Sequence, residues 1–386
     1  MMSVLYLTNY DSAGHVEELE SKVGRFQVIL GKLPSTSDKW LLSSALQKSI
    51  RRGHIETAVS VATKLLEIDP AYLPRRLPII AAEDVGIGGL EVCHDVFDMC
   101  GSSKWWRTGA AQTVAFLVSS LAAATKCRAA CDALCLAAVQ QDANQLLPRL
   151  LAQPSDGLIG VAADRQRPWL ERALALRVLG GISERNGGTY RVLSKCNVPA
   201  LKLVGAELAM PPLVLALMAK QARSGGLAAF LPLAVEAAGE SRRVALGSAC
   251  PDSDQLFEGL PLCGVDMFSE LGRSALREFF LSPNIRRFTA QHCWARSPVR
   301  MLNMAMFHVE SSNLDRYLCS DGLSRLTAET ETQELLQLGL SSAERRQELY
   351  ALLRSEAEAL AQIRIFRLRA SHHQLDGVKG SYGGLS

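Results

Sequence analysis

The chain has 386 residues, of which 48% are hydrophobic and 21% charged, and its net charge is +3. This length allows two or three domains or one elongated helical array, and the composition is ordinary for a globular protein. The small net charge does not by itself indicate nucleic-acid binding, so any such contact must come from a local cluster of basic residues.

Ten cysteines without a secretory signal favour free thiols in a reducing cytoplasm. The first residues carry no basic region, and Asn9 and Asp11 come too early for a signal peptide. The most apolar run, residues 109–124, is shorter than the ~20 residues of a membrane span and contains Gln112 and Thr113. We therefore expect a cytoplasmic protein with a buried helix at 109–124 and no membrane contact.

Residues 1–35 form a short lead-in, with a possible strand at 4–7 and a helix at 15–30. The chain that follows is rich in alanine and leucine and has few alternating β-branched runs, which predicts an all-α or nearly all-α fold. Within the segment 40–86, two runs of apolar residues at helical spacing are separated by Gly53. Asp69-Pro70 has the form of a helix start and Gly86 that of a helix end, so three short helices are expected here.

The first helical domain is expected to cover residues 36–150, with a boundary in the loop-forming sequence 153–157. Residues 151–340 read as a helical extension, interrupted by glycine pairs and containing an amphipathic helix within 264–282. An amphipathic helix at 341–370, capped by Ser341 or Ser342, and a flexible tail at 371–386 complete the expected organisation.

Three motifs occur in a fixed order, SSALQKSIRRG from Ser43, DPAYLPRR from Asp69 and AAEDVG from Ala81. Together they resemble the C-terminal helical region of the replication-associated recombination protein A family, which are AAA+ ATPases related to clamp loaders. The resemblance covers residues 36–138 and becomes weaker beyond Trp105. It implies a clamp-loader-type helical collar that supports self-association.

The chain departs from that family in two ways. No GxxxxGK[ST] sequence occurs, and residues 86–89 lack the lysine and the preceding strand of a phosphate-binding loop, so they read as a turn and no ATPase activity is expected. Pro74 and Pro78 interrupt a stretch that the family forms as one helix. We expect that helix to start late or to kink, because a proline inside a helix removes a hydrogen bond.

Charged residues near the third motif suggest a structural network rather than a catalytic pair. Arg75 and Arg76 lie one to two turns before Glu83 and Asp84. A catalytic carboxylate pair would need a base from elsewhere in the fold, which the sequence does not identify. We therefore expect these four residues to form structural ion pairs.

Cys127, Cys131 and Cys135 repeat every four residues on an expected helix, and Cys93, His94 or Cys100 could complete a metal site. Structural zinc sites, however, normally use closely spaced cysteines in loops, and buried cysteine behaves as a small apolar residue. Packing in the core is the preferred interpretation, with no metal and no cofactor.

Two segments without acidic residues are candidates for nucleic-acid contact. The first, between Glu278 and Glu310, combines four arginines with aromatic side chains, and the second, 99–131, begins with a basic and aromatic cluster. Arginine suits phosphates and aromatic faces suit unpaired bases, although an ordinary solvated basic face has the same composition. The candidate residues are Arg286, Arg287, Trp294, Arg296, Arg300, Lys104 and Arg107.

The leading hypothesis is a non-catalytic binding or scaffold protein of DNA replication, recombination or repair, with a mobile element as its expected carrier. It would self-associate and contact DNA or replication proteins. One alternative is a decoy that mimics the helical collar and blocks assembly of a host complex. The other is an enzyme with a helical active site, which a pocket joining Glu83 and Asp84 to a histidine would favour.

Overall fold

The computed structural model describes residues 12–107, 109–139, 141–186, 189–247, 255–295 and 297–380. Helices make up 71% of it, which confirms the expected, nearly all-α fold. The α-helices are α1 (Ser12–Arg25), α2 (Lys39–Arg51), α3 (Ile55–Ile68), α4 (Leu73–Ile80), α5 (Leu90–Gly101), α6 (Lys104–Arg107), α7 (Ala110–Ala123), α8 (Ala129–Val139), α9 (Gln141–Leu151), α10 (Ser155–Ala163), α11 (Trp169–Gly180), α12 (Val198–Glu207), α13 (Pro212–Ala219), α14 (Leu231–Ala238), α15 (Glu270–Phe279), α16 (Pro283–His292), α17 (Val299–Ser311), α18 (Asp321–Gln337), α19 (Arg345–Ser355) and α20 (Ala357–Gly380).

The described strands pair as three small antiparallel sheets, β1 (Ile182–Asn186) with β2 (Thr189–Ser194), β3 (Arg243–Leu246) with β6 (Arg316–Cys319), and β4 (Leu256–Phe257) with β5 (Leu260–Pro261). The β3–β6 pair is extended by one residue from a third part of the chain. The Lys126 N–H donates to the Arg316 carbonyl at 2.7 Å, and the Leu318 N–H donates to the Lys126 carbonyl at 2.9 Å. This small ladder therefore joins three segments that are far apart in the sequence.

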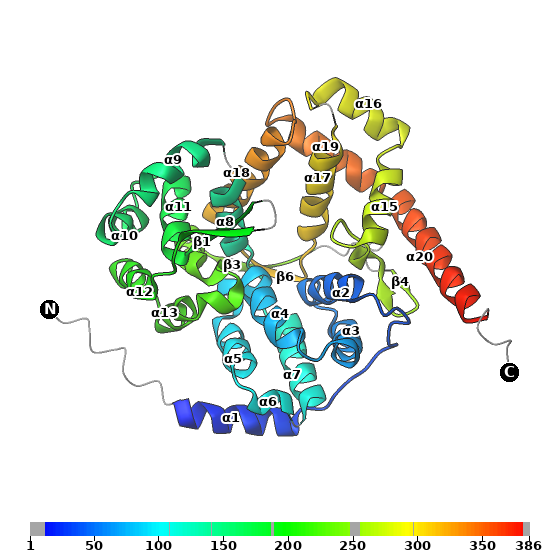
Figure 1. Ribbon diagram of the computed structural model, residues 1–386, viewed down its shortest axis with the longest axis horizontal. Helices are drawn as coiled ribbons and strands as arrows, with labels where there is room; N and C mark the ends of the chain where they lie inside the picture. Colours follow the sequence, from blue (N-terminus) through cyan, green and yellow to red (C-terminus); the bar gives the residue numbers. More distant parts are fainter. Residues whose placement is uncertain are drawn as a thin grey trace.

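Two hydrophobic cores hold the helices together. The larger core contains α2, α3, α5, α7, α8 and α11, and it continues without a break across residue 150 because α8 packs on both α11 and α14. The smaller core is built from α15 to α20. In Figure 1 helices α15 to α19 lie in the upper part and α20 runs down the right-hand side, whereas α5, α6 and α7 lie at the bottom.

The segment 40–86 forms the three expected helical stretches, but the third helix starts later than predicted. Gly53 separates α2 from α3 in a left-handed conformation (φ +69°), and Gly86 ends the third helical stretch (φ +49°). The expected start at Asp69-Pro70 is wrong: Asp69 follows the last residue of α3, and α4 begins at Leu73. A turn at 70–72 intervenes, so the helix starts late, as the prolines predicted.

Pro78 lies inside α4, and the helix widens immediately after it. Residues Ala81–Val85 form a π-helical turn, closed by a hydrogen bond from the Gly86 N–H to the Ala81 carbonyl. Residues Gly86–Gly89 then form a 3-10 turn. A Cβ at Gly88 would lie 2.3 Å from the Thr125 carbonyl oxygen, so close approach of two backbones explains this glycine.

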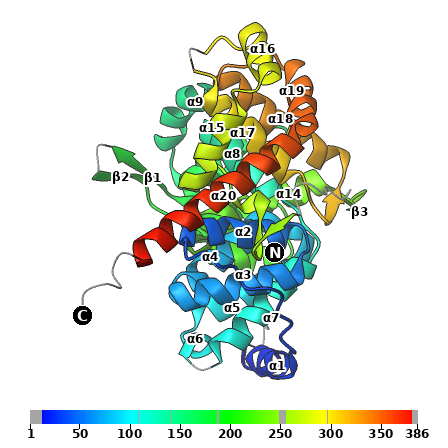
Figure 2. The same cartoon turned by 90° about the vertical axis from the view of Figure 1, so that its right-hand side faces the viewer.

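Other expected elements differ in their ends. The first helix ends at Arg25, earlier than predicted, and the expected strand at 4–7 lies outside the described residues. The expected helix at 341–370 is divided into α19 and α20, and neither Ser341 nor Ser342 caps α19, which follows Glu344. Helix α20 continues to Gly380, into the segment 371–386 expected to be a flexible tail, and runs along one side of the molecule (Figure 2).

The apolar run 109–124 forms α7, whose Val114, Leu117, Val118 and Leu121 lie in the larger core, as expected for a buried helix. Among the described residues, no helix combines the length and the apolar character needed to cross a bilayer.

Candidate functional site

Helix α2 is the centre of the polar site, because it is buried on almost every side. All residues from Leu41 to Arg51 are buried, and the Asp38 side chain caps the helix by accepting hydrogen bonds from the Trp40 and Leu41 N–H groups. Apolar side chains fill one side of the helix. The other side carries four polar residues at helical spacing, namely Ser44, Gln47, Lys48 and Arg51.

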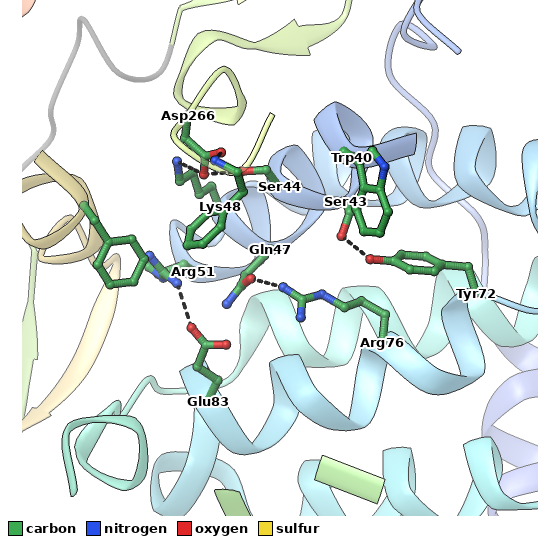
Figure 3. Close-up of a pocket in the computed structure, with 12 residues that line it drawn as sticks. Trp40, Ser43, Ser44, Gln47, Lys48, Arg51, Tyr72, Arg76, Glu83 and Asp266 are labelled. Carbon is green, nitrogen blue, oxygen red and sulfur yellow. Dashed lines mark hydrogen bonds and ion pairs between the residues drawn. The ribbon is translucent and has the colours of Figure 1, made fainter. Parts of the chain in front are cut away.

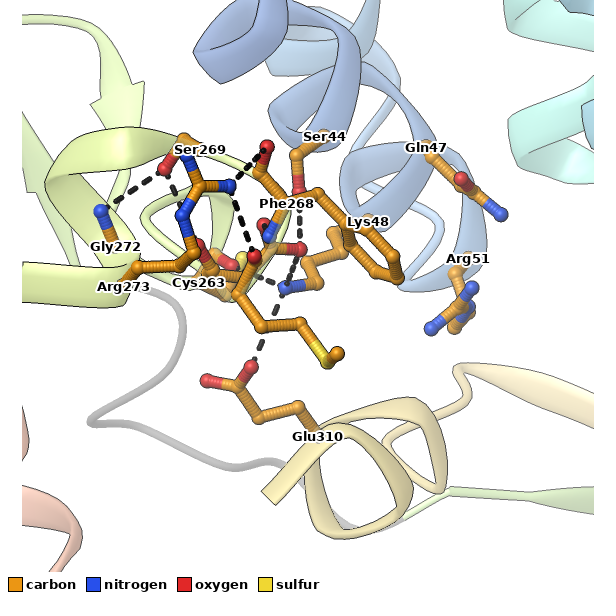
Figure 4. Close-up of polar contacts among 12 residues, drawn as sticks. Ser44, Gln47, Lys48, Arg51, Cys263, Phe268, Ser269, Gly272, Arg273 and Glu310 are labelled. Carbon is orange, nitrogen blue, oxygen red and sulfur yellow. Dashed lines mark hydrogen bonds and ion pairs between the residues drawn. The ribbon is translucent and has the colours of Figure 1, made fainter. Parts of the chain in front are cut away.

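Lys48 is held at the junction between the two cores. Its ammonium group donates to Asp266 at 2.7 Å, to Glu310 at 3.3 Å and to the Cys263 carbonyl at 2.5 Å (Figure 4). The Ser44 hydroxyl also donates to Asp266, at 2.5 Å. Arg364 from α20 completes the cluster with a 2.7 Å ion pair to Glu310. These buried contacts connect α2, the segment before α15, α17 and α20.

The positive charges around Glu310 have a larger effect on its pKa than burial has. Burial alone would raise the pKa of this carboxyl group, but Arg364 and Lys48 lower it to about 2. Glu310 is therefore ionised in the folded protein, and it is a buried counter-ion rather than a proton carrier.

A second cluster forms where the π-helical turn faces α2. Asp84 is fully buried and accepts hydrogen bonds from the Arg51 Nε at 2.7 Å and the Gln47 Nε2 at 2.8 Å, and it lies 3.3 Å from the Arg128 Nε. Glu83 lies 3.6 Å from both arginines. Burial would raise the pKa of Asp84, but the two guanidinium groups outweigh it and lower the pKa.

The predicted charge network is therefore present in part, and its main partners come from outside the motif. Glu83 and Asp84 pair with Arg51 and Arg128, not with the arginines two turns upstream. Arg76 joins indirectly by donating to the Gln47 side-chain oxygen. Arg75 is exposed, and among the described residues no ion pair joins its side chain to Glu83 or Asp84.

A cavity of about 380 Å³ lies between the two clusters and opens to solvent (Figure 3). Its walls carry two aromatic pairs in edge-to-face contact. The ring centroids of Trp40 and Tyr72 are 6.4 Å apart, and those of Phe268 and Phe307 are 5.9 Å apart. The other lining residues are Ser43, Ser44, Gln47, Lys48, Arg51, Arg76, Glu83 and Asp266. The described lining contains no histidine or cysteine, so this cavity does not join Glu83 to a histidine.

A second cavity, of about 450 Å³, lies between α8 and α18. Asp132 lines it and accepts a 2.6 Å hydrogen bond from Thr327, and burial raises the pKa of Asp132. On the same side, Glu331 forms an ion pair with Arg346 at 3.5 Å, and burial raises the pKa of Glu331 too. The sequence contained no motif for this second acidic group.

The expected helical row of cysteines is present in part, since Cys131 and Cys135 lie on α8 and Cys127 does not. Cys127 precedes α8, which begins at Ala129, and its N–H donates to the Asp84 carbonyl at 2.9 Å. Cys127 belongs to the larger core and Cys131 packs against it, which agrees with the packing interpretation. Burial raises the pKa of the Cys127 thiol to about 12. Cys93 and Cys100 are also buried in the larger core, on α5.

The two basic segments lie at opposite ends of the molecule. Arg286 and Arg287 are exposed on α16, with Trp294 (68% exposed) after it and Arg300 exposed on α17. Arg296 lies outside the described residues. Figures 1 and 2 both show α16 at the top and α6 near the bottom. The expected residues therefore do not form one surface.

On α6 the basic residues already have partners. Lys104 forms an ion pair with Glu20 of α1, and the Arg107 guanidinium donates to the Ser103 hydroxyl at 2.8 Å. On α16 and α17, by contrast, no ion pair is recorded for Arg286, Arg287 or Arg300 with any described residue. The α16 end is therefore the stronger nucleic-acid candidate of the two.

The fold and site define a mostly helical protein with two contrasting charged regions. One is the buried ionic junction beside α2, where Lys48 and Arg51 pair with Asp266, Glu310 and Asp84. The other is the exposed basic end formed by α16 and the start of α17. No family model matches the chain, and neither a curated protein nor a solved structure is significantly similar to it.

Proposed function

We propose that this chain is a non-catalytic binding or scaffold protein of DNA replication, recombination or repair that contacts single-stranded DNA through its α16 end. The observation that carries the proposal is the exposure of Arg286, Arg287, Arg300 and Trp294 at one end of the molecule, where the arginines lack carboxylate partners among the described residues. Guanidinium groups bind phosphates, and an exposed indole stacks on a base. The link to DNA maintenance rests on the sequence resemblance.

The polar cavity beside α2 supports a non-catalytic role. Lys48 is held by Asp266 and Glu310, and Arg51 is held by Asp84. The lining does place one hydroxyl, that of Ser44, next to a carboxylate, but this carboxylate, Asp266, is already paired with Lys48. A group that is locked in a buried ion pair contributes to the fold and is not available for proton transfer. The enzyme hypothesis therefore has less support than the binding hypothesis.

Self-association is the second part of the proposal, with a second copy of the chain as partner. Between α1 and α2 three consecutive apolar residues, Val28, Ile29 and Leu30, are 45%, 58% and 50% exposed. A contiguous exposed apolar run favours a protein contact. Sedimentation velocity of wild type and Ile29→Asp tests this: we expect an oligomer that the substitution dissociates, and a monomeric wild type would contradict it.

The DNA contact is tested by fluorescence anisotropy with a labelled oligothymidylate at several salt concentrations. We expect wild type to bind, with an affinity that falls steeply as salt rises, because bound phosphates release counter-ions. The combined variant Arg286→Gln, Arg287→Gln, Arg300→Gln should reduce the slope of log affinity against log salt by about 2, at roughly 0.7 per phosphate contact. Trp294→Ala should weaken binding without changing that slope.

The matched control is Arg75→Gln, which removes an exposed arginine on α4, away from α16. It should bind DNA as wild type does. Absence of binding by wild type, or equal binding by the triple variant, would overturn the DNA contact. Recovery of a protein partner from the native host that survives nuclease treatment, together with no DNA binding, would instead support the decoy hypothesis.

A further inference from the structure

Two histidines and two aspartates meet where α1 lies against α5, far from the α2 cavity. His94, Asp95 and Asp98 belong to α5, and His15 comes from α1. His94 and Asp98 are four residues apart, so they share a face of α5. The two imidazole rings meet edge to face, with their centroids 5.3 Å apart. Figure 1 shows α1 at the bottom of the molecule, beside α5 and α6.

The distances within this cluster are close to those of a metal site. One ligand atom from each of His15, His94 and Asp98 lies within 4.8 Å of the others. The His94 Nδ1 is 3.5 Å from Asp98 Oδ2, and the His15 Nε2 is 3.2 Å from Asp95 Oδ1. In a tetrahedral zinc site with bonds of about 2.0–2.1 Å, neighbouring ligand atoms are about 3.3–3.4 Å apart. A contraction of the three ligand atoms by at most about 1.4 Å would bring them to this spacing around an ion.

The surroundings also suit a metal ion. His94 is buried, which shields a metal site from solvent, and imidazole binds a metal ion in its neutral form. Asp98 contributes a negative charge, and its two oxygens face different groups. Lys220 contacts Oδ1, whereas Oδ2 faces His94. This arrangement matches metal sites in which an outer residue orients a ligating carboxylate.

We propose that His15, His94 and Asp98 bind one Zn²⁺ ion, with Asp95 or a water molecule as the fourth ligand. Two imidazoles and a carboxylate are a donor set that zinc accepts. Because the ligands come from two helices, the ion cross-links α1 to α5. Helix α1 is otherwise anchored by its buried Leu19 and Val23, by the ion pair between Glu20 and Lys104, and by Gln112 of α7, which donates to the carbonyls of Val23 and Phe26.

The test is a titration of the full chain with Co²⁺, after treatment with a chelator and its removal. All proteins carry His372→Gln and His373→Gln, so that the paired histidines near the C-terminus do not bind the ion. We expect one equivalent of Co²⁺ to give visible absorption bands of the intensity of a four-coordinate site, and one equivalent of Zn²⁺ to abolish them. Thermal unfolding in the presence of Zn²⁺ should occur at a higher temperature.

Variants separate a built site from adventitious binding. His15→Ala and Asp98→Asn should each lower the Co²⁺ affinity at least a hundredfold and remove the thermal shift, while unfolding in chelator like the parent. Lys220→Met should weaken binding by about tenfold, as expected for a residue that orients a ligand. His292→Ala on α16 is the control and should bind as the parent does. Absence of the bands, or equal binding by His15→Ala, would overturn the proposal.

Discussion

The junction beside α2 and the end formed by α16 use the same kind of side chain in opposite ways. At the junction, Lys48 and Arg51 are buried and each contacts buried carboxylates at 2.7 Å. At the α16 end, Arg286 and Arg287 are exposed, and no ion pair is recorded for either with the described residues. A buried charge has to be compensated within the protein, whereas an exposed one remains available to a ligand.

This difference shows why composition alone does not locate a binding surface. Both regions look basic in the sequence, as SIRR before Gly53 and NIRR within α16. The distinction depends on acids that are distant in the sequence, such as Asp266 and Glu310 beside α2. Stability should therefore depend on the first region, and binding on the second.

The largest expected effect comes from breaking the ion pairs around Asp84. Asp84→Asn leaves the buried Arg51 and the nearly buried Arg128 without their main counter-ion, which should lower the free energy of unfolding by about 3–5 kcal/mol. Urea denaturation followed by circular dichroism measures this. Asp69→Asn is the matched control, since Asp69 is partly exposed and pairs with Lys39 at 3.2 Å, and it should cost less than about 1 kcal/mol. Equal effects of the two variants would contradict the structural importance of the junction.

The second-largest expected effect is a dependence of stability on pH, and it is caused by the titration of Glu310. Its pKa is about 2 in the folded protein and near the ordinary value of 4.5 when unfolded. Because the folded value is the lower one, this group stabilises the protein fully above pH 4.5, and the stabilisation is lost as pH falls from 4.5 towards 2. At neutral pH it contributes roughly 3 kcal/mol, since one pKa unit corresponds to about 1.4 kcal/mol.

The measurement compares wild type with Glu310→Gln, because other groups titrate in the same range with the opposite sign. Burial raises the pKa of Asp132 and of Glu331, and raises that of Asp95 to about 6, so their contributions increase as pH falls. The difference in unfolding free energy between the two proteins should be largest above pH 4.5 and should shrink towards pH 2. A difference that does not change with pH would show that Glu310 is not held by its cations.

Local patterns in the sequence predicted the helices well where apolar spacing and glycine punctuation agree. The break at Gly53 and the end at Gly86 are examples, because each needs a left-handed backbone that glycine adopts easily. Capping motifs were less reliable: Asp69-Pro70 and Ser341-Ser342 have the composition of helix starts, but the helices begin three or more residues later. Packing of the neighbouring helices decides such ends, and the sequence does not show it.

The site was predicted in part for the same reason. Glu83 and Asp84 were identified because they stand together before a glycine, but their partners Arg51 and Arg128 are 33 and 44 residues from Asp84. The sequence contained one usable signal for α2, since Ser44, Gln47, Lys48 and Arg51 recur at helical spacing and so share one side of the helix. The acids at Asp266 and Glu310 could not be assigned, because long-range pairing follows from the tertiary fold.

The smallest expected effect on stability completes the comparison and comes from the α16 end. Arg286→Gln and Arg287→Gln together should leave the urea midpoint of unfolding unchanged, because both side chains are exposed and no partner among the described residues would be left uncompensated. The same variant should lose DNA affinity, so stability and binding respond separately. A clear loss of stability would mean that these arginines serve the fold, as those of α2 do, and the α16 end would then no longer differ from the junction.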